Sequence, residues 1–316
     1  MKTYFIVNPA SGKSNSLNEI TEKLADCELE YEIYTTKCKN DATEFIKKIC
    51  SENPDKQFRF CACGGDGTLN EVVNGAVHFD NAEVTCYPCG SGNDYVKYYG
   101  GKERFMDIKS LITAPAEPID LVKVGDRYSI NVVNFGFDTE VCRTMEKVKT
   151  KPVIGGGNAY ITGVVKSVLT AMKTNGEVYG DGELLNDKNR FLLCTIANGK
   201  YVGGQFCCAP RSVNDDGLME VCLVKKISRF TFIQLVGAYE KGKHLDDKRF
   251  KKYIEYRRCK KVEVKSGEGF AITLDGEVID GNEFTCEIAH KKLCFAIPPL
   301  NSEIAEDEKE LAAVSN

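Results

Sequence analysis

Residues 58–75 read FRFCACGGDGTLNEVVNG, and this stretch carries most of the structural information in the chain. Its first six residues are apolar except for Arg59, which predicts a short buried strand. Glycines follow, and then Leu69, Val72 and Val73 recur at helical spacing. A strand, a glycine-rich turn and a helix in this order are the repeating unit of a parallel α/β sheet.

The same unit repeats through the first part of the chain. Apolar runs predict four strands, at Tyr4–Val7, Tyr31–Thr36, Phe58–Cys63 and Val84–Tyr87, with amphipathic helices between them. Short strand–helix alternation favours a doubly wound, mostly parallel sheet with helices on both faces. We therefore expect an α/β domain over residues 1–118, with ligands at the carboxyl ends of its strands.

The pattern changes near Pro118. Gly125-Asp126 lies between two apolar runs and predicts a hairpin. One helical insertion is expected around Asn158–Met172. We expect a mostly antiparallel β-sandwich domain over residues 119–297. Whether the segment 298–316 returns to the first domain is left open. The further strands are expected at Arg190–Ile196, Met219–Val224, Lys261–Val264, Ala271–Leu274, Phe284–Ile288 and Leu293–Ile297.

Composition narrows the class of protein. The 316 residues carry a net charge of −4, so overall charge does not favour nucleic acid as a partner. Four apolar residues at 4–7 are too few for a signal peptide, and no apolar run has the length of a membrane span. We expect a cytoplasmic protein whose 15 cysteines are reduced and mostly act as small buried hydrophobic residues. A zinc site is the alternative for the four cysteines at 61, 63, 86 and 89, although the first pair has unsuitable spacing.

Three turns after predicted strands are rich in glycine, asparagine and hydroxyl groups, at residues 8–14, 64–71 and 90–94. Glycine lets a backbone approach a ligand closely, and the N–H groups at a helix start favour an anion. Three such turns at one sheet edge predict a phosphate-binding site. They match neither a P-loop, because Val7 replaces its first glycine, nor the Rossmann fingerprint.

The turn at 64–75 resembles the signature of the diacylglycerol-kinase catalytic-domain family, which includes soluble bacterial lipid kinases. Asn8-Pro9-x-Ser11-Gly12 is similar to that family's first nucleotide loop, and residues 88–94 are similar to its third. The likeness continues through residues 134–138, 203–218 and 274–277, so it spans roughly residues 5–297.

The resemblance implies ATP and Mg²⁺ as cofactors and an active site in a cleft between the two domains. Asp66 would contact nucleotide or metal, and Glu277 with Asp275 would form the catalytic pair, with the identity of the base left open. A second, structural Mg²⁺ would be held by Asp216 with the carbonyls of Val213 and Leu218. The implied nucleotide contacts are Asn8, Pro9, Ser11, Gly12, Lys13, Thr36, Gly64, Gly65, Asp66, Gly67, Thr68, Asn70, Glu71, Gly90, Ser91, Asn93 and Asp94.

The expected activity is therefore phosphoryl transfer from ATP to a lipid hydroxyl, with diacylglycerol as the first choice of acceptor. Another lipid such as phosphatidylglycerol or a sphingoid base, an NAD kinase, and a non-catalytic nucleotide or lipid sensor are the alternatives. Residues 241–261 contain ten basic and three acidic residues, a net charge of +7. We interpret this stretch as either a solvated helix face or a contact for anionic lipid at the inner membrane surface. A homodimer is left open.

Overall fold

The computed structural model describes residues 1–11, 16–25, 27–149 and 173–300. The chain forms two compact units, Met1–Ile119 with Lys292–Asn316 and Asp120–Lys291. It passes from one unit to the other in β5 (Ala116–Val124) and β19 (Glu283–Ala296). The helical insertion expected at Asn158–Met172 and the acidic tail lie outside the described residues.

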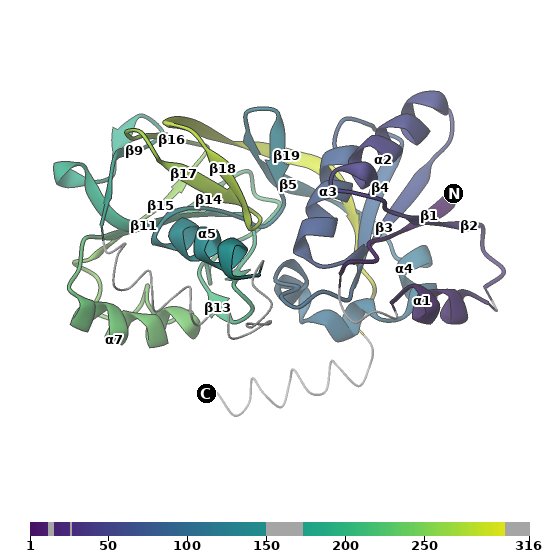
Figure 1. Ribbon diagram of the computed structural model, residues 1–316, viewed down its shortest axis with the longest axis horizontal. Helices are drawn as coiled ribbons and strands as arrows, with labels where there is room; N and C mark the ends of the chain where they lie inside the picture. The colour runs from purple at the N-terminus through teal and green to yellow at the C-terminus, as the bar shows by residue number, and fades with distance from the viewer. Residues whose placement is uncertain (12–15, 26, 150–172, 301–316) are drawn as a thin grey trace. The chain divides into compact units, whose positions relative to one another are not determined.

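The first unit is a parallel sheet with the strand order β4-β3-β1-β2, and the last residues of β19 pair in parallel with β4. Helices and turns alternate with these strands, as the sequence predicts (Figure 1). The elements are β1 (Lys2–Val7), α1 (Ser16–Leu24), β2 (Tyr31–Thr35), α2 (Asp41–Glu52), β3 (Phe58–Gly64), α3 (Asp66–Ala76), β4 (Ala82–Pro88), η1 (Tyr95–Tyr99), η2 (Lys102–Phe105) and α4 (Ile108–Thr113).

Helices cover both faces of this sheet. Successive side chains of a strand point to opposite faces. On one face, the ring of Tyr4 in β1 meets Phe45 of α2 with centroids 5.5 Å apart. On the other, Arg59 of β3 donates to the carbonyl of Leu111 in α4, and Tyr87 of β4 donates to Glu19 of α1. The doubly wound α/β prediction is confirmed.

The strands of the first unit end together. Val7 pairs with both Thr35 and Cys63, and Cys63 pairs with Tyr87. The four carboxyl ends are therefore in register at one edge of the sheet. The turns that follow β1, β3 and β4 leave the sheet at this edge, where ligands bind in open parallel sheets.

The second unit is made of antiparallel sheets. One sheet has the order β15-β14-β11-β7-β17-β18, with β8 beside β11. The other strands run β10-β9-β16-β19, and β5 pairs with β6. The bounds are β6 (Arg127–Ser129), β7 (Val132–Gly136), β8 (Thr174–Asn175), β9 (Glu177–Gly180), β10 (Glu183–Leu184), η3 (Asp187–Asn189), β11 (Arg190–Ala197), β12 (Tyr201–Val202), β13 (Phe206–Cys207), β14 (Met219–Lys225), β15 (Ile254–Cys259), β16 (Lys261–Lys265), β17 (Ala271–Leu274) and β18 (Glu277–Asp280).

The core of the second unit lies between its sheets. Phe135 and Val221 of one sheet share a buried cluster with Val178 and Val262 of the other, and all four are fully buried. Two helices, α5 (Phe137–Lys149) and α7 (Arg229–Glu240), pack on a second cluster that includes Leu192 and Val224 (Figure 1). The β-sandwich prediction is confirmed.

Two sequence predictions differ from the structure. The strands expected at Phe284–Ile288 and Leu293–Ile297 are one strand, β19, because its backbone continues through the polar residues 290–292 with Lys291 at a φ of 48°. The stretch 241–261 is not one helix face. Its second half is β15, whose backbone pairs with β14 from Met219–Cys259 to Val224–Ile254.

Candidate active site

The three glycine-rich turns of the first unit touch one another. The side-chain amide of Asn8, which follows β1, donates to the Thr68 hydroxyl at the start of α3 at 3.1 Å. The N–H groups of Cys89 and Gly90, which follow β4, donate to the carbonyl of Gly64 at 3.0 and 3.2 Å. These bonds bring three separate predicted turns together at the carboxyl edge of the sheet.

Glycine is required where these turns meet. A Cβ on Gly90 would lie 2.3 Å from the Cα of Gly65, and a Cβ on Gly64 would lie 2.2 Å from the Thr68 hydroxyl oxygen. By contrast, nothing lies within 4 Å of a Cβ added at Gly67, which is exposed. The close approach packs the turns, whereas the open space at Gly67 faces solvent at the N-terminus of α3, where backbone N–H groups attract an anion.

Two carboxylates lie beside the same glycine. Asp66 Oδ1 accepts from the N–H of Asp94 at 2.7 Å, which ties the start of α3 to the turn after β4. A Cβ on Gly92 would be 2.9 Å from Asp66 Oδ2 and 3.5 Å from Asp94 Oδ2. Lys97 donates to Asp94 Oδ1 at 2.6 Å. Carboxylate oxygens are the kind of ligand that Mg²⁺ takes in proteins together with substrate phosphates and water.

The other predicted nucleotide contacts differ in position. Pro9 and Ser91 are exposed on their turns, and Asn93 closes its own turn by exchanging hydrogen bonds with Gly90. Thr36 is buried at the end of β2, where its N–H donates to Val7. Ser11 is half-buried, and the Cβ of a residue at Gly65 would lie 3.6 Å from its hydroxyl. Gly12 and Lys13 lie outside the described residues.

Asn70 and Glu71 lie one turn into α3 rather than at its start. Asn70 is 3% exposed, and its side-chain oxygen accepts from Asn74 at 3.2 Å. The backbone carbonyl of Glu71 accepts the Thr43 hydroxyl of α2 at 2.7 Å. These contacts give Asn70 and Glu71 a part in packing α3, besides any contact with a ligand.

In the second unit, Asp275 organises the β17–β18 turn. It has a φ of 48°, and its carboxylate accepts four hydrogen bonds from residues 129–132. The donors are the Ser129 hydroxyl at 2.6 Å and the N–H groups of Ile130, Asn131 and Val132 at 2.9–3.1 Å. A carboxylate held this way is a fixed acceptor that shapes the loop between β6 and β7.

Glu277 lies two residues further on, at the start of β18. Its carboxylate forms an ion pair with Arg127 of β6, and the Glu277 side chain is 25% exposed. Arg127 was not predicted as a site residue, since the two partners are 150 residues apart and no local pattern connects them. The guanidinium holds the Glu277 carboxylate at the solvent-accessible end of the hairpin.

The turn that contains Asp216, the residue expected to hold a second metal, is held by side-chain and backbone contacts. The Asp216 carboxylate pairs with the guanidinium of Arg258, which also donates to the buried carboxylate of Glu220 at 2.9 Å. The fully buried Asp120, another residue without a sequence signal, accepts the N–H of Gly217 at 2.6 Å and fixes the same turn. The N–H of Leu218 donates to Asp216 Oδ1 at 3.0 Å and Arg258 pairs with Oδ2, so both oxygens of this carboxylate are engaged and the second metal that the resemblance implies gains no support.

The cysteines at the ends of β3 and β4 are buried thiols. Burial raises the pKa of Cys61 and Cys86 well above the usual thiol value, so both are protonated at neutral pH. The Cys61 and Cys63 sulfurs lie 3.9 Å apart. Within the described residues, no three His, Cys, Asp or Glu side chains are grouped as metal ligands. The zinc alternative therefore gains no support.

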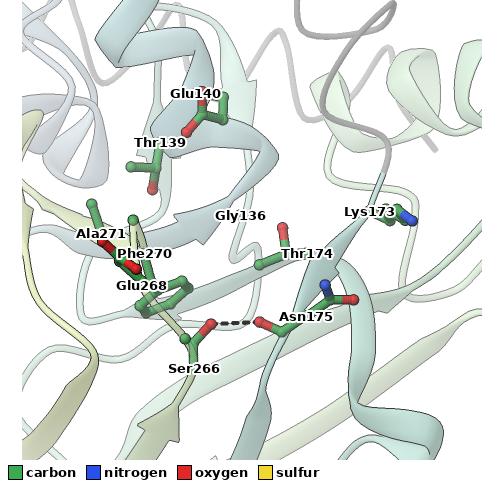
Figure 2. Close-up of a pocket in the computed structure, with 12 residues that line it drawn as sticks. Gly136, Thr139, Glu140, Lys173, Thr174, Asn175, Ser266, Glu268, Phe270 and Ala271 are labelled. Carbon is green, nitrogen blue, oxygen red and sulfur yellow. Dashed lines mark hydrogen bonds between the residues drawn. The ribbon is translucent and has the colours of Figure 1, made fainter.

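A cavity of about 380 Å³ opens in the second unit beside Phe270 and Ser266 (Figure 2). Ser266 donates to the carbonyl of Asn175 at its floor, at 2.6 Å. Charged and polar side chains contribute much of its lining. Ala271 marks the cavity end of β17, and Asp275 follows the other end, roughly 13 Å away at strand spacing. The cavity is thus separate from the Asp275–Glu277 turn.

Comparison with known proteins assigns the class. The family described as "Diacylglycerol kinase catalytic domain" matches residues 2–124, and "YegS C-terminal NAD kinase beta sandwich-like domain" matches residues 131–294. Together they cover both units with the carboxylates and turns described above. The chain belongs to the diacylglycerol kinase family of lipid kinases.

Individual relatives agree with this assignment. A diacylglycerol kinase of Bacillus subtilis is 30% identical over 279 residues, which cover 86% of this chain and 88% of the relative. A probable lipid kinase YegS-like protein of Shewanella frigidimarina is 25% identical over 82% of each chain. The crystal structure of a diacylglycerol kinase from Bacillus anthracis has the same fold, with a TM-score of 0.68 at 20% identity, over 94% of this chain and 97% of that one.

Proposed function

We propose that this chain transfers the γ-phosphoryl group of ATP to a lipid hydroxyl, with diacylglycerol as the acceptor and phosphatidic acid as the product. The observation that carries the proposal is the meeting of three glycine-rich turns at the carboxyl edge of the first unit, beside Asp66. The relatives named diacylglycerol kinase support the choice of acceptor.

On the nucleotide side, the turns supply N–H groups for the phosphates, and the N-terminus of α3 adds a favourable dipole. Asp66 and Asp94 are the residues that would hold Mg²⁺, which supplies charge neutralisation on the phosphate oxygens. Lys97, bonded to Asp94, keeps that carboxylate in place. The chain's own contribution is thus mainly positioning and charge, which is what phosphoryl transfer requires.

On the acceptor side, we assign different roles to the two carboxylates. Asp275 already accepts four hydrogen bonds, so it positions the turn and is a poor candidate for the base. Glu277 is the candidate base that accepts the proton of the lipid hydroxyl late in transfer. Arg127 orients Glu277 through their ion pair. Transfer requires the lipid hydroxyl to give its proton to Glu277 while its oxygen attacks the γ-phosphate of ATP.

The test is transfer of labelled phosphate from ATP to a panel of lipids, separated by thin-layer chromatography. The panel holds diacylglycerol, phosphatidylglycerol and a sphingoid base, with NAD as a non-lipid acceptor. We expect label in phosphatidic acid, and a loss of about 100-fold or more for Asp66→Asn and Glu277→Gln. Asp55→Asn removes an exposed carboxylate of the same unit as Asp66 and serves as the control.

Each other result has a definite meaning. Label on another lipid replaces diacylglycerol as the acceptor, and label on NAD contradicts the lipid assignment. ATP binding without transfer to any acceptor would indicate a sensor. Near-normal turnover of a folded Glu277→Gln variant would remove Glu277 as the base, and the same result for Asp66→Asn would remove Asp66.

A further inference from the structure

Helix α7 carries an apolar face that the residues described by the structure leave uncovered. Phe230 is 73% exposed and Ile233 is 69% exposed, the highest values among the large hydrophobic residues that the structure describes. They lie three positions apart, so they share one side of the helix. The opposite side packs Phe232 and Leu235 into the second unit. Apolar residues thus occur on both sides of α7, although only one side is needed for packing.

The sequence around α7 is rich in basic residues. Residues 225–253 contain nine basic and three acidic residues, a net charge of +6 in a chain whose total is −4. Two of the acidic side chains pair with arginine, Asp246 with Arg211 and Asp247 with Arg249. The exposed lysines of the segment are Lys226, Lys241, Lys243, Lys248, Lys251 and Lys252.

The segment after α7 folds back onto the helix. Lys243 N–H donates to the carbonyl of Ala238 at 2.8 Å, and Phe250, 1% exposed, is buried in the same cluster as Phe232. The segment that carries Lys248, Lys251 and Lys252 therefore packs in the same cluster as α7. We call Phe230, Ile233 and the six lysines named above the α7 face.

The α7 face is narrower than the basic stretch read from the sequence. Arg257 pairs with Glu255 and Glu183, and Arg258 pairs with Asp216 and Glu220. Both arginines lie in β15, where their charges are balanced by neighbouring carboxylates. The unbalanced positive charge therefore lies before β15, in the segment that contains α7.

We propose that the α7 face docks on an anionic lipid bilayer, with Phe230 and Ile233 entering the interface and the lysines contacting anionic headgroups. Apolar insertion combined with basic residues is the usual basis of interfacial binding. A second copy fits poorly, since a two-fold contact through α7 would place +6 against +6. The inference rests on the proposed function, because the acceptor of a lipid kinase lies in a bilayer.

Vesicle cosedimentation without ATP or diacylglycerol tests the docking directly. We expect binding to vesicles of phosphatidylcholine mixed with phosphatidylglycerol, weak binding to phosphatidylcholine alone, and release at high salt. The double variant Phe230→Ser with Ile233→Ser should partition at least about tenfold more weakly, because each side chain loses its apolar burial. Lys248→Glu with Lys251→Glu and Lys252→Glu should lose the preference for anionic vesicles.

The matched control is Leu184→Ser, which removes a 49% exposed leucine from β10 of the same unit and should bind vesicles as the wild type does. Circular dichroism confirms folding, which these exposed substitutions should preserve. Equal vesicle binding by the wild type and the Phe230–Ile233 double variant overturns the proposal. So does a wild-type dimer that the double variant dissociates, measured by light scattering, since a second copy would then cover the face.

A kinase assay separates this inference from the proposed function. With dissolved short-chain diacylglycerol, the Phe230–Ile233 double variant should retain wild-type turnover. With diacylglycerol in anionic vesicles, its turnover should fall at least about tenfold, in parallel with binding. Wild-type turnover on both substrates without vesicle binding would refute the docking and leave the proposed function standing. Vesicle binding without any lipid phosphorylation would refute the proposed function and leave the docking standing.

Discussion

Replacing Gly90 with alanine should separate two of the turns that we propose to bind phosphate. The new Cβ would lie 2.3 Å from the Cα of Gly65, which is backbone and cannot rotate away. Ordinary carbon–carbon contact is at about 3.5 Å, so the turns must part by about 1 Å. Overpacking of this kind costs about 1–3 kcal/mol of folding free energy. A misplacement of about 1 Å is also enough to lower activity by about 100-fold.

Two measurements check the Gly90→Ala prediction. Thermal unfolding should show a Tm lower by about 2–10 °C, and calorimetric titration should show weakened ATP binding. Gly67→Ala is the matched control for stability, because its Cβ meets nothing within 4 Å and its helical position favours alanine. We therefore expect Gly67→Ala to keep or raise the Tm. Wild-type Tm and ATP affinity in Gly90→Ala would refute the claim that the two turns touch.

Three further predictions concern the second unit and the thiols. Burial raises the pKa of Asp138 to about 6, above the unfolded value of 3.8, and Oδ2 of this carboxyl has no hydrogen-bond partner among the described residues. The stability linked to the protonated form of Asp138 therefore falls as pH rises towards 6. Asp138→Asn should flatten this fall and raise stability above pH 6 by up to about 3 kcal/mol, and equal pH–Tm curves would contradict this. Arg258→Met should lower the free energy of unfolding by about 3–5 kcal/mol, because it leaves buried Glu220 unpaired. EDTA should leave the Tm of Asp66→Asn unchanged, since this variant lacks a proposed ligand of the catalytic Mg²⁺, and a Tm that falls with EDTA in this variant would restore the second metal. A thiol reagent should label exposed Cys38 and Cys294 first in the native protein, which mass spectrometry of the labelled protein would measure. Rapid labelling of the β3 thiols would show instead that the sheet edge opens.

Local patterns predicted most of the first unit. Apolar periodicity placed β1–β4 to within a few residues, because short loops leave few alternatives for a parallel α/β chain. The second unit was predicted less precisely. The polar residues 290–292 separate the two apolar runs that were expected as separate strands, although one face of a strand can stay polar while its backbone bonds continue.

Capping signals were less reliable than periodicity. Asp41 with Glu44 three residues later has the pattern of a capping box, but α2 begins at Asp41, and the Asp41 carboxylate accepts from the Tyr34 hydroxyl and from the N–H of Lys37. Ser16 with Glu19 has the same pattern in the sequence, but the Glu19 carboxylate accepts from the Tyr87 hydroxyl and pairs with Lys23. A short polar side chain accepts whichever donor the folded chain brings near, and these donors come from other elements.

The glycine-rich turns and the order of strands and helices could be read directly along the chain, because a turn's backbone conformation depends on adjacent residues. The family followed from the same local motifs. The hydrogen bonds of Asp275, the pairing of Glu277 with Arg127 and the pairing of Asp216 with Arg258 join residues up to 150 positions apart, and the exposed side of α7 depends on which side of the helix packs. Only the folded chain brings such partners within hydrogen-bond distance or leaves an apolar face uncovered, so these features had no signal in any single stretch of sequence.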